Sequence, residues 1–141
     1  MAFYVDSCIY LNLWKREECN DKLFWKIATN FFERVQKTGE IIYISPFVMK
    51  ELSFRLNTST LQCRLGEIRS SSMFENIEAN RDDYKEARRL ESASEFEISF
   101  FDCMHVVLAR RMGAVLVTRD NKLLDFAYIF CSVGRPEDFC E

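Results

Sequence analysis

The sequence predicts an α/β fold, a three-layer sandwich around a central, mostly parallel sheet of four or five strands. Short apolar segments of strand type alternate with longer segments of helical periodicity along the whole chain. No repeat and no internal boundary interrupts that alternation. The 141 residues include only four glycines and two prolines, so long flexible linkers are not expected. We therefore expect a single domain over residues 1–141.

Five segments are expected to form the sheet. AFYV at 2–5 and AVLVT at 114–118 are apolar nearly throughout, as strands covered on both faces are. The other segments are EIIYI at 40–44, the weakly marked MFENIE at 73–78, and YIFCSV at 128–133. Strands joined by helices are typical of a parallel, doubly wound sheet, in which sites form beyond the carboxyl ends of the strands.

Helices are expected between these strands. Residues 21–38 repeat apolar side chains at helical spacing and are followed by Gly39, a candidate C-cap. Ser45 as N-cap and Pro46 at the first helical position predict another helix start. The segment SFFDCMHVVLARRMG, at 99–113, is apolar nearly all round and predicts a central helix. The remaining helices are expected at 6–14, 60–70 and 80–94.

The composition limits the classes of function. Hydrophobic residues make up 48% of the chain, which excludes disorder, and the six cysteines form no CxxC pair. No apolar run approaches the roughly 18 residues of a membrane span, and MAFYVDSCIY lacks the basic region of a signal peptide. We therefore expect a cytoplasmic protein in which most of the six cysteines are reduced and buried. The net charge of −3 argues against nucleic-acid binding by bulk charge alone, although bound divalent cations would reverse the local sign.

Four acidic residues lie at or just beyond predicted strand ends. Asp6 directly follows the first strand, and Asp120 follows the fourth. Glu51 lies one and a half turns into a helix, and Asp102 is in the first turn of the central helix. Each has a structural alternative: Asp6 and Asp120 as helix N-caps, Asp102 in a capping box with Ser99, Glu51 on a solvated face. Right-handed crossovers would bring all four toward one edge of the sheet, where converging carboxylates indicate Mg²⁺ or Mn²⁺.

Four segments resemble, in this order, the acidic motifs of the PIN-domain family: YVDSCIYL, SPFVMKEL, SFFDCMHVVLARRMG and VLVTRDNKLL. The compact length is most similar to the VapC-type toxins of toxin–antitoxin pairs. The resemblance implies RNA cleavage dependent on Mg²⁺ or Mn²⁺, with four metal-binding and catalytic acids: Asp6, Glu51, Asp102 and Asp120. It also implies supporting roles for Ser7, Thr118 and Asn121. Residues 60–95 match no motif of the family.

Other polar residues near these motifs have two interpretations each. Four cations are expected either to contact RNA phosphates or to remain solvated on the surface: Arg110, Arg111, Arg119 and Lys122. His105, the only histidine, follows Asp102 by one turn. We interpret it as a hydrogen-bonded core histidine rather than a catalytic group, because this metal chemistry needs no imidazole.

Other classes of protein meet specific objections. A haloacid-dehalogenase-like phosphatase would need an acid two residues after Asp6, where Cys8 stands, and a receiver domain would need paired acids there. The sequence contains no Gly-rich or Walker nucleotide-binding loop. Two alternatives stay open beside the toxin: a PIN nuclease of RNA maturation or decay without an antitoxin, and a non-catalytic PIN-like interaction module.

A homodimer and a small antitoxin are the expected protein partners. The segment NDKLFWKIATNFFERV carries Phe24, Trp25, Phe31 and Phe32 on more than one helical face. We expect the core alone not to bury all of them, and exposed apolar rings usually mark an interface. The resemblance points the same way, since VapC-type proteins generally dimerise and are held inactive by an antitoxin. The alternative is that a packed three-layer core takes up every ring.

Overall fold

A single parallel sheet of five strands forms the centre of the computed structural model, which describes residues 1–140. The strands lie in the order β5-β4-β1-β6-β7, and every neighbouring pair is parallel. Their bounds are β1 (Ala2–Val5), β4 (Ile41–Ile44), β5 (Phe74–Asn76), β6 (Val115–Val117) and β7 (Val133–Gly134). The predicted parallel sheet is confirmed, and the strand nearest the N-terminus lies at its centre.

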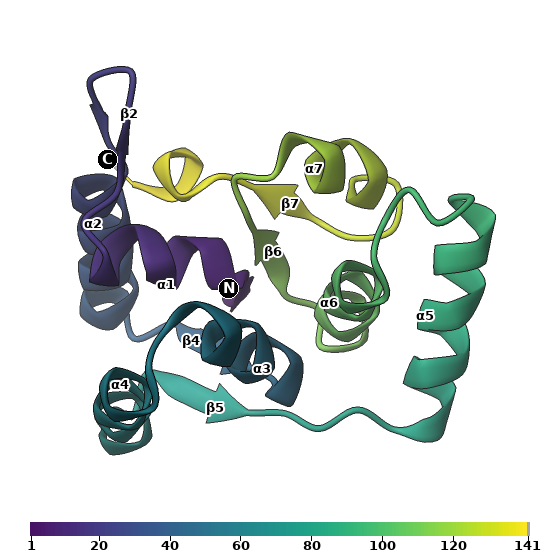
Figure 1. The fold of residues 1–141 in the computed structure, drawn as a ribbon, viewed down its shortest axis with the longest axis horizontal. Helices are drawn as coiled ribbons and strands as arrows, with labels where there is room; N and C mark the ends of the chain where they lie inside the picture. Colours follow the sequence, from purple (N-terminus) through teal and green to yellow (C-terminus); the bar gives the residue numbers. More distant parts are fainter. Residues whose placement is uncertain (141) are drawn as a thin grey trace.

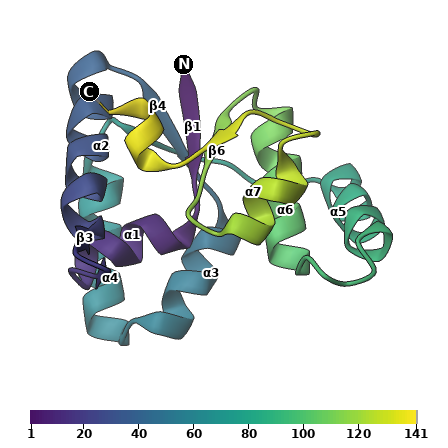
Figure 2. The same ribbon diagram turned by 90° about the horizontal axis from the view of Figure 1, so that it is seen from above.

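Helices cover both faces of this sheet. Figure 1 and Figure 2 show α1, α2 and α4 on one side and α5, α6 and α7 on the other, which confirms the three-layer sandwich. The helices are α1 (Ser7–Trp14), α2 (Phe24–Thr38), α3 (Pro46–Arg55), α4 (Thr58–Ser70), α5 (Arg81–Ala93), α6 (Phe100–Arg111) and α7 (Asn121–Ala127). Of the helices in residues 1–140, none has the length and apolarity needed to cross a membrane.

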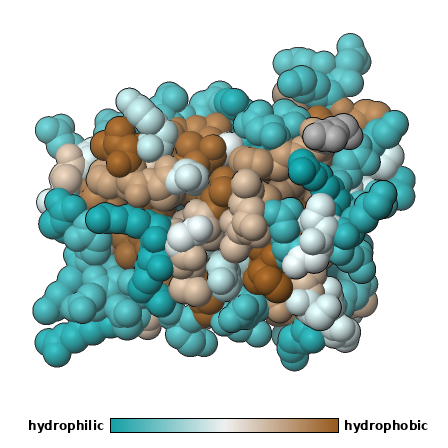
Figure 3. Space-filling model, turned by 180° about the vertical axis from the view of Figure 1, so that it is seen from behind, coloured by the Kyte–Doolittle hydropathy of each residue, from teal (hydrophilic) through white to brown (hydrophobic). Residues whose placement is uncertain are grey.

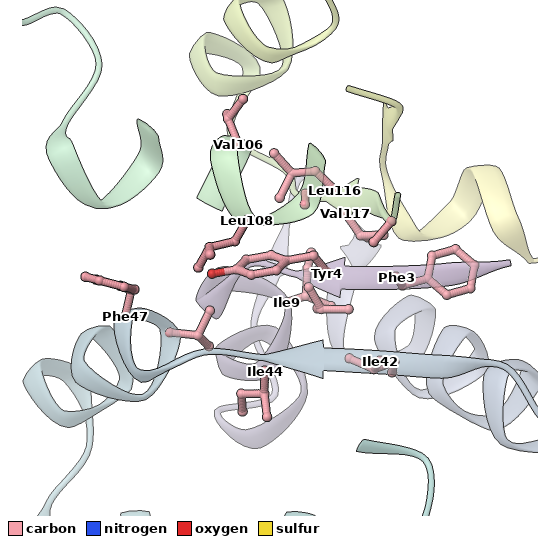
Figure 4. Close-up of a cluster of buried hydrophobic side chains, with 14 of the residues drawn as sticks. Phe3, Tyr4, Ile9, Ile42, Ile44, Phe47, Val106, Leu108, Leu116 and Val117 are labelled. Carbon is pink, nitrogen blue, oxygen red and sulfur yellow. The ribbon is translucent and has the colours of Figure 1, made fainter. Parts of the chain in front are cut away.

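The core lies between the sheet and the two helical layers. Phe3, Tyr4 and Val5 of β1 are at most 2% exposed, because strands flank β1 on both sides and helices cover both its faces. Helix α6 is buried from Cys103 to Ala109, as its apolar sequence predicted. Figure 4 shows the Tyr4 ring in the middle of this buried cluster, among side chains from β4, β6 and α6.

The predicted helix boundaries around β4 are confirmed. Gly39 ends α2 with a positive φ of 75°, a conformation that glycine adopts without strain. Ser45 caps α3 by accepting a hydrogen bond from the Val48 amide at 3.3 Å, and Pro46 takes the first helical position. These caps fix where α3 begins and therefore where Glu51 lies.

Two predicted boundaries are wrong. The helix expected from residue 21 begins at Phe24, because β2 (Glu18–Cys19) and β3 (Lys22–Leu23) form a small hairpin first. Asn20 and Asp21 form its turn, with φ of 48° and 64°. The strand expected at 128–133 is confined to β7, because the amides of Phe130 and Cys131 bond back to the carbonyl of Ala127 at the end of α7.

The core does not bury all four rings of α2, as expected. Phe31 is fully buried against Phe3, with ring centroids 5.2 Å apart, and Phe32 packs on Tyr10 at 5.4 Å. Phe24 lies under the guanidinium of Arg119, and Trp25 lies under that of Arg16. The core therefore takes up Phe31 and part of Phe32, whereas Phe24 and Trp25 stay half-buried under arginine side chains. The large apolar side chains that are exposed lie elsewhere: Met1, Phe54, Tyr84, Phe96, Tyr128 and Ile129.

Candidate metal centre

Asp6 lies where β1 ends, at the switch point of the sheet. Its backbone amide extends the β1–β6 pairing by bonding to the Val117 carbonyl at 2.9 Å. Its Oδ1 caps α1 by accepting from the Ser7 amide at 2.8 Å, and its Oδ2 accepts from the Thr118 hydroxyl at 2.7 Å. Only 6% exposed, the Asp6 carboxylate is both a cap and a fixed member of the sheet edge.

The end of β6 supplies Thr118 and Asp120. Thr118 is fully buried, and its hydroxyl also accepts from the Asp120 amide at 3.2 Å. Asp120 caps α7, with Oδ1 accepting from the amides of Lys122 and Leu123 at 3.0 and 3.3 Å. The Asp120 side chain is exposed, so this acid lies at the rim of the centre.

Helix α6 carries Asp102 and His105 on one face, three positions apart. Ser99 caps the helix by accepting from the Asp102 amide at 3.2 Å. The reciprocal bond of a capping box, from the Ser99 amide to the Asp102 carboxylate, does not occur among the described residues. The Asp102 side chain is therefore available for another partner.

Glu51 reaches the centre from α3. Its Oε1 lies 2.7 Å from Nε2 of His105, and that nitrogen lies 3.8 Å from Oδ1 of Asp6. With Asp102, these residues each offer one ligand atom, and the four atoms lie within 4.8 Å of one another. The fold thus brings three of the four predicted acids together, whereas Asp120 stands outside this tight group.

The electrostatics of the centre show the cost of gathering these acids. Burial raises the pKa of Asp102 to about 6; the charge of His105 opposes this shift, and Asp6, Glu51 and Asp120 add to it. Burial works to lower the pKa of His105, but the hydrogen bond that His105 donates to Glu51 and the charges of the nearby acids outweigh it, so the pKa is raised. Three carboxylates offer oxygen ligands that suit a hard divalent cation, and the charge of such a cation would relieve the repulsion between them.

Cys8 is a further neighbour of the centre. Its thiol lies 3.5 Å from Oδ2 of Asp6 and 3.7 Å from the Thr118 hydroxyl. Burial, with the charge of Asp6, raises the pKa of the Cys8 thiol well above its usual value. The thiol therefore stays protonated and donates to the carboxylate.

The predicted supporting and RNA-contacting residues are spread more widely. The Ser7 hydroxyl lies 3.5 Å from Oδ1 of Asp6, beside the centre. Asn121 instead accepts a hydrogen bond from Arg135 through its side-chain oxygen. Arg119, with a side chain 12% exposed, pairs with Glu137 at 2.9 Å.

The remaining predicted cations lie on α6 and α7. Lys122 is exposed and pairs with Glu97 at 2.9 Å. Arg111 ties α6 to α5 by pairing with Asp83 at 3.1 Å. Arg110 is exposed and lines a depression of about 480 Å³ between the same two helices.

His105 is the member of the centre that the sequence assigned to a different role. It is buried and hydrogen-bonded, as predicted for a core histidine, but one of its partners is the site acid Glu51. Its spacing from Asp102 is the one sequence signal that could have placed it there, because side chains three apart share a helix face. No pattern in the sequence indicated that its other partner is Tyr4.

A parallel α/β sandwich with carboxylates gathered beyond the central strands defines a protein with a candidate divalent-cation centre at the carboxyl edge of its sheet. The model of the PIN domain family matches residues 3–128, and the chain belongs to that family. This match spans all four acids of the predicted motifs. No curated protein matches the chain.

Solved structures share the fold. A chain of VapBC2 from Rickettsia felis, crystallised bound to a DNA fragment from its promoter, superimposes with a TM-score of 0.70 at 20% identity, covering 96% of this chain and 98% of that one. A chain of FitAcB from Neisseria gonorrhoeae gives 0.64 at 16% identity, with coverage of 96% and 98%. FitAB bound to the IR36 DNA fragment gives 0.64 at 16%, with coverage of 95% and 94%.

Proposed function

We propose that this protein is a Mg²⁺- or Mn²⁺-dependent ribonuclease that acts as the toxin of a toxin–antitoxin pair. The observation that carries the proposal is the convergence of Asp6, Glu51, Asp102 and His105 within 4.8 Å at the carboxyl edge of a PIN-domain sheet. A bound divalent cation supplies a lowered pKa for the attacking water and neutralises charge developing on the phosphate. Asp6, Glu51, Asp102 and, from the rim, Asp120 are the proposed ligands.

The chain's own residues hold this centre ready before any substrate binds. Ser7, Cys8 and Thr118 each donate to the Asp6 carboxylate, so its orientation is fixed by groups from α1 and β6. Asp120 differs because its exposed carboxylate has an oxygen outside the α7 cap. It is positioned to complete the centre from the solvent side.

The substrate has an open approach beside Glu51. A depression of about 520 Å³ is lined by Glu51, Phe54, Phe100, Phe101, Ser99 and Arg88. It offers the exposed ring of Phe54 and the guanidinium of Arg88, groups of the kind that contact bases and phosphates of single strands. Arg110, Arg119 and Lys122 remain proposed phosphate contacts, of which Arg119 would first have to leave Glu137.

The decisive experiment is cleavage of a defined single-stranded RNA by the purified protein. We expect cleavage with Mn²⁺ or Mg²⁺, none with EDTA, and a loss of at least a hundredfold in Asp6→Asn at matched folding. A folded protein that leaves RNA intact under all conditions would favour the non-catalytic interaction module. Sequencing new 5′ ends after induction in cells would then identify the cleavage site and the RNA target.

The proposed protein partners need separate tests. The resemblance of the sequence to VapC-type toxins, and the fold that the chain shares with the VapBC2 and FitAB structures, support an antitoxin partner here. Growth rescue by a small protein encoded directly upstream would support the toxin. Its absence would favour a PIN nuclease of RNA maturation or decay.

The proposed homodimer rests on exposed apolar surface. Phe54, Tyr84, Phe96, Tyr128 and Ile129 are between 47% and 71% exposed, and Figure 3 shows apolar residues gathered between hydrophilic ones on one face of the molecule. Light scattering after size-exclusion chromatography should give twice the mass of 16.7 kDa. A monomer at tens of micromolar would refute the dimer and leave the nuclease proposal standing.

A further inference from the structure

A chain of buried polar side chains runs through the core to the candidate metal centre. The Tyr4 hydroxyl lies 2.6 Å from the Ser45 hydroxyl and 2.6 Å from Nδ1 of His105, whose Nε2 lies 2.7 Å from Glu51. Tyr4, Ser45 and His105 are all fully buried, and Figure 4 shows the Tyr4 hydroxyl within the apolar cluster. Polar groups in such surroundings are costly unless each has a partner. This hydrogen-bond network therefore needs a specific explanation.

When the His105 imidazole is neutral, the available donors and acceptors define the direction of each hydrogen bond in this network. An ionised Glu51 carboxylate only accepts hydrogen bonds, so the proton between it and His105 is on Nε2. Ser45 accepts from the Val48 amide at 3.3 Å, which leaves its hydroxyl hydrogen for the Tyr4 oxygen. Tyr4 then donates to Nδ1. Every member has a partner, and successive bonds in one direction strengthen each other.

We propose that His105 is a positioning residue that holds the Glu51 carboxylate in the centre, with its tautomer fixed by Tyr4 and Ser45, and that it is not a metal ligand. A protonated ring nitrogen has no lone pair for a cation. Ser45 also caps α3, the helix that carries Glu51. The same hydrogen-bond network therefore fixes both the start of α3 and the position of the Glu51 carboxylate. This inference rests on the proposed metal-dependent function for its consequence, but its geometry can be tested alone.

The first test observes the tautomer directly. The chain has one histidine, so protein labelled with ¹⁵N-histidine and purified without a histidine tag shows only this ring. Spectra are recorded without metal and with Mg²⁺ at mildly alkaline pH. A proton on Nε2 in both states supports the bond to Glu51, and a bare Nδ1 beside it supports the tautomer set by Tyr4; a proton on Nδ1 as well would overturn the role of Tyr4. A bare Nε2 in either state overturns the whole assignment, whatever the protein does to RNA.

The second test substitutes residues of the hydrogen-bond network and measures how Mn²⁺ changes the melting temperature. The readout is the Mn²⁺ concentration that gives half of the maximal rise in melting temperature. We expect His105→Leu to raise this concentration by about 10- to 100-fold, the range for losing a partner of a metal ligand. His105→Gln should recover most of the loss, because its amide donates near the position of Nε2. Tyr4→Phe should raise the concentration by about tenfold.

Tyr10 provides the matched control. It is also a buried tyrosine, 1% exposed, but its hydroxyl has no hydrogen-bond partner among residues 1–140. Tyr10→Phe should leave the Mn²⁺ response unchanged, and the pair Tyr4→Phe and Tyr10→Phe still decides the matter if His105→Leu does not fold. Equal responses of both tyrosine variants and the wild type would overturn the inference. A wild type that neither cleaves RNA nor responds to Mn²⁺ would instead overturn the proposed function.

Discussion

The chain leaves β1 and β6 by the same local route, since in both places an apolar strand is followed by an aspartate that caps the next helix. At β1 the capping Asp6 is 6% exposed and receives a second set of hydrogen bonds from Thr118 and Cys8. At β6 the capping Asp120 is exposed, and both bonds to its carboxylate come from amides of α7. The same local pattern therefore gives a buried carboxylate held from two sides after β1 and an exposed carboxylate after β6, and tertiary packing makes the difference.

The largest expected effect is on RNA cleavage, and it distinguishes Asp6 from Asp120. Asp6→Asn should lower metal-dependent RNA cleavage by two to three orders of magnitude, the loss typical of removing one preorganised charge-stabilising group. Asp120→Asn should lower it by about tenfold, because that carboxylate is neither buried nor held from two sides. Single-turnover cleavage at saturating Mn²⁺ measures both. Equal losses would remove the distinction between the two strand ends.

Metal binding should show the same contrast without RNA. A cation that binds only the folded protein, at about a hundredfold excess over its Kd, stabilises by about 2.7 kcal/mol. We expect Mn²⁺ to raise the melting temperature of the wild type and of Asp120→Asn, but not of Asp6→Asn. If Mn²⁺ shifts none of the three while acidification shifts all of them, the aspartates are helix caps only.

Asp102, which faces both strand ends, provides a pH-dependent prediction. Burial raises its folded pKa to about 6, above the usual 3.9 of the unfolded chain. Ionisation of Asp102 thus costs stability in the folded state, a cost that is absent below about pH 4 and complete above about pH 6. The shift corresponds to nearly 3 kcal/mol, which partial solvent contact reduces to about 2 kcal/mol.

Metal-free Asp102→Asn should accordingly unfold with a free energy about 2 kcal/mol higher than the wild type near pH 7, and about equal to it near pH 4. Urea denaturation with a chelator present, at both pH values, measures the difference. A difference that does not change with pH would mean that the Asp102 carboxylate is not desolvated.

The smallest expected effect concerns the cap at the end of β6. Asp120→Ala removes the acceptor for the Lys122 and Leu123 amides and should cost about 1 kcal/mol of stability. Asp120→Asn keeps an equivalent acceptor and should cost only a few tenths. Chemical denaturation of the two variants compares them. A matching loss in both would assign the stability to the charge and not to the cap.

Much of the fold could be predicted because local and tertiary signals agree. β1 is apolar on both faces and its bounds match the prediction, and Ser45 with Pro46 starts α3 where expected. The bounds of the strand predicted at 128–133 were wrong because an apolar segment is compatible with the end of a helix as well as with a strand. Asn20 and Asp21 did carry a turn signal, but the strands beside them are only two residues long.

The site could be predicted less completely, for a physical reason. Acids that follow strands are visible in a sequence because the strand that positions them is local. The role of His105 depends on Tyr4 and Glu51, which lie 101 and 54 residues away. Such contacts exist only after α3 and α6 have packed beside β1, and no local pattern encodes them.

The central position of β1 has a consequence for the synthesis of this protein. Asp6 and its partner Thr118 are separated by 112 residues, so a ribosome adding about 5–20 residues per second makes them roughly 6 to 22 seconds apart. Until β6 emerges, β1 has no neighbour on that side, and any fragment that stops before Thr118 lacks part of the centre. We therefore expect the proposed nuclease to stay inactive until β6 has joined β1, and we expect products that end before Thr118 to be inactive.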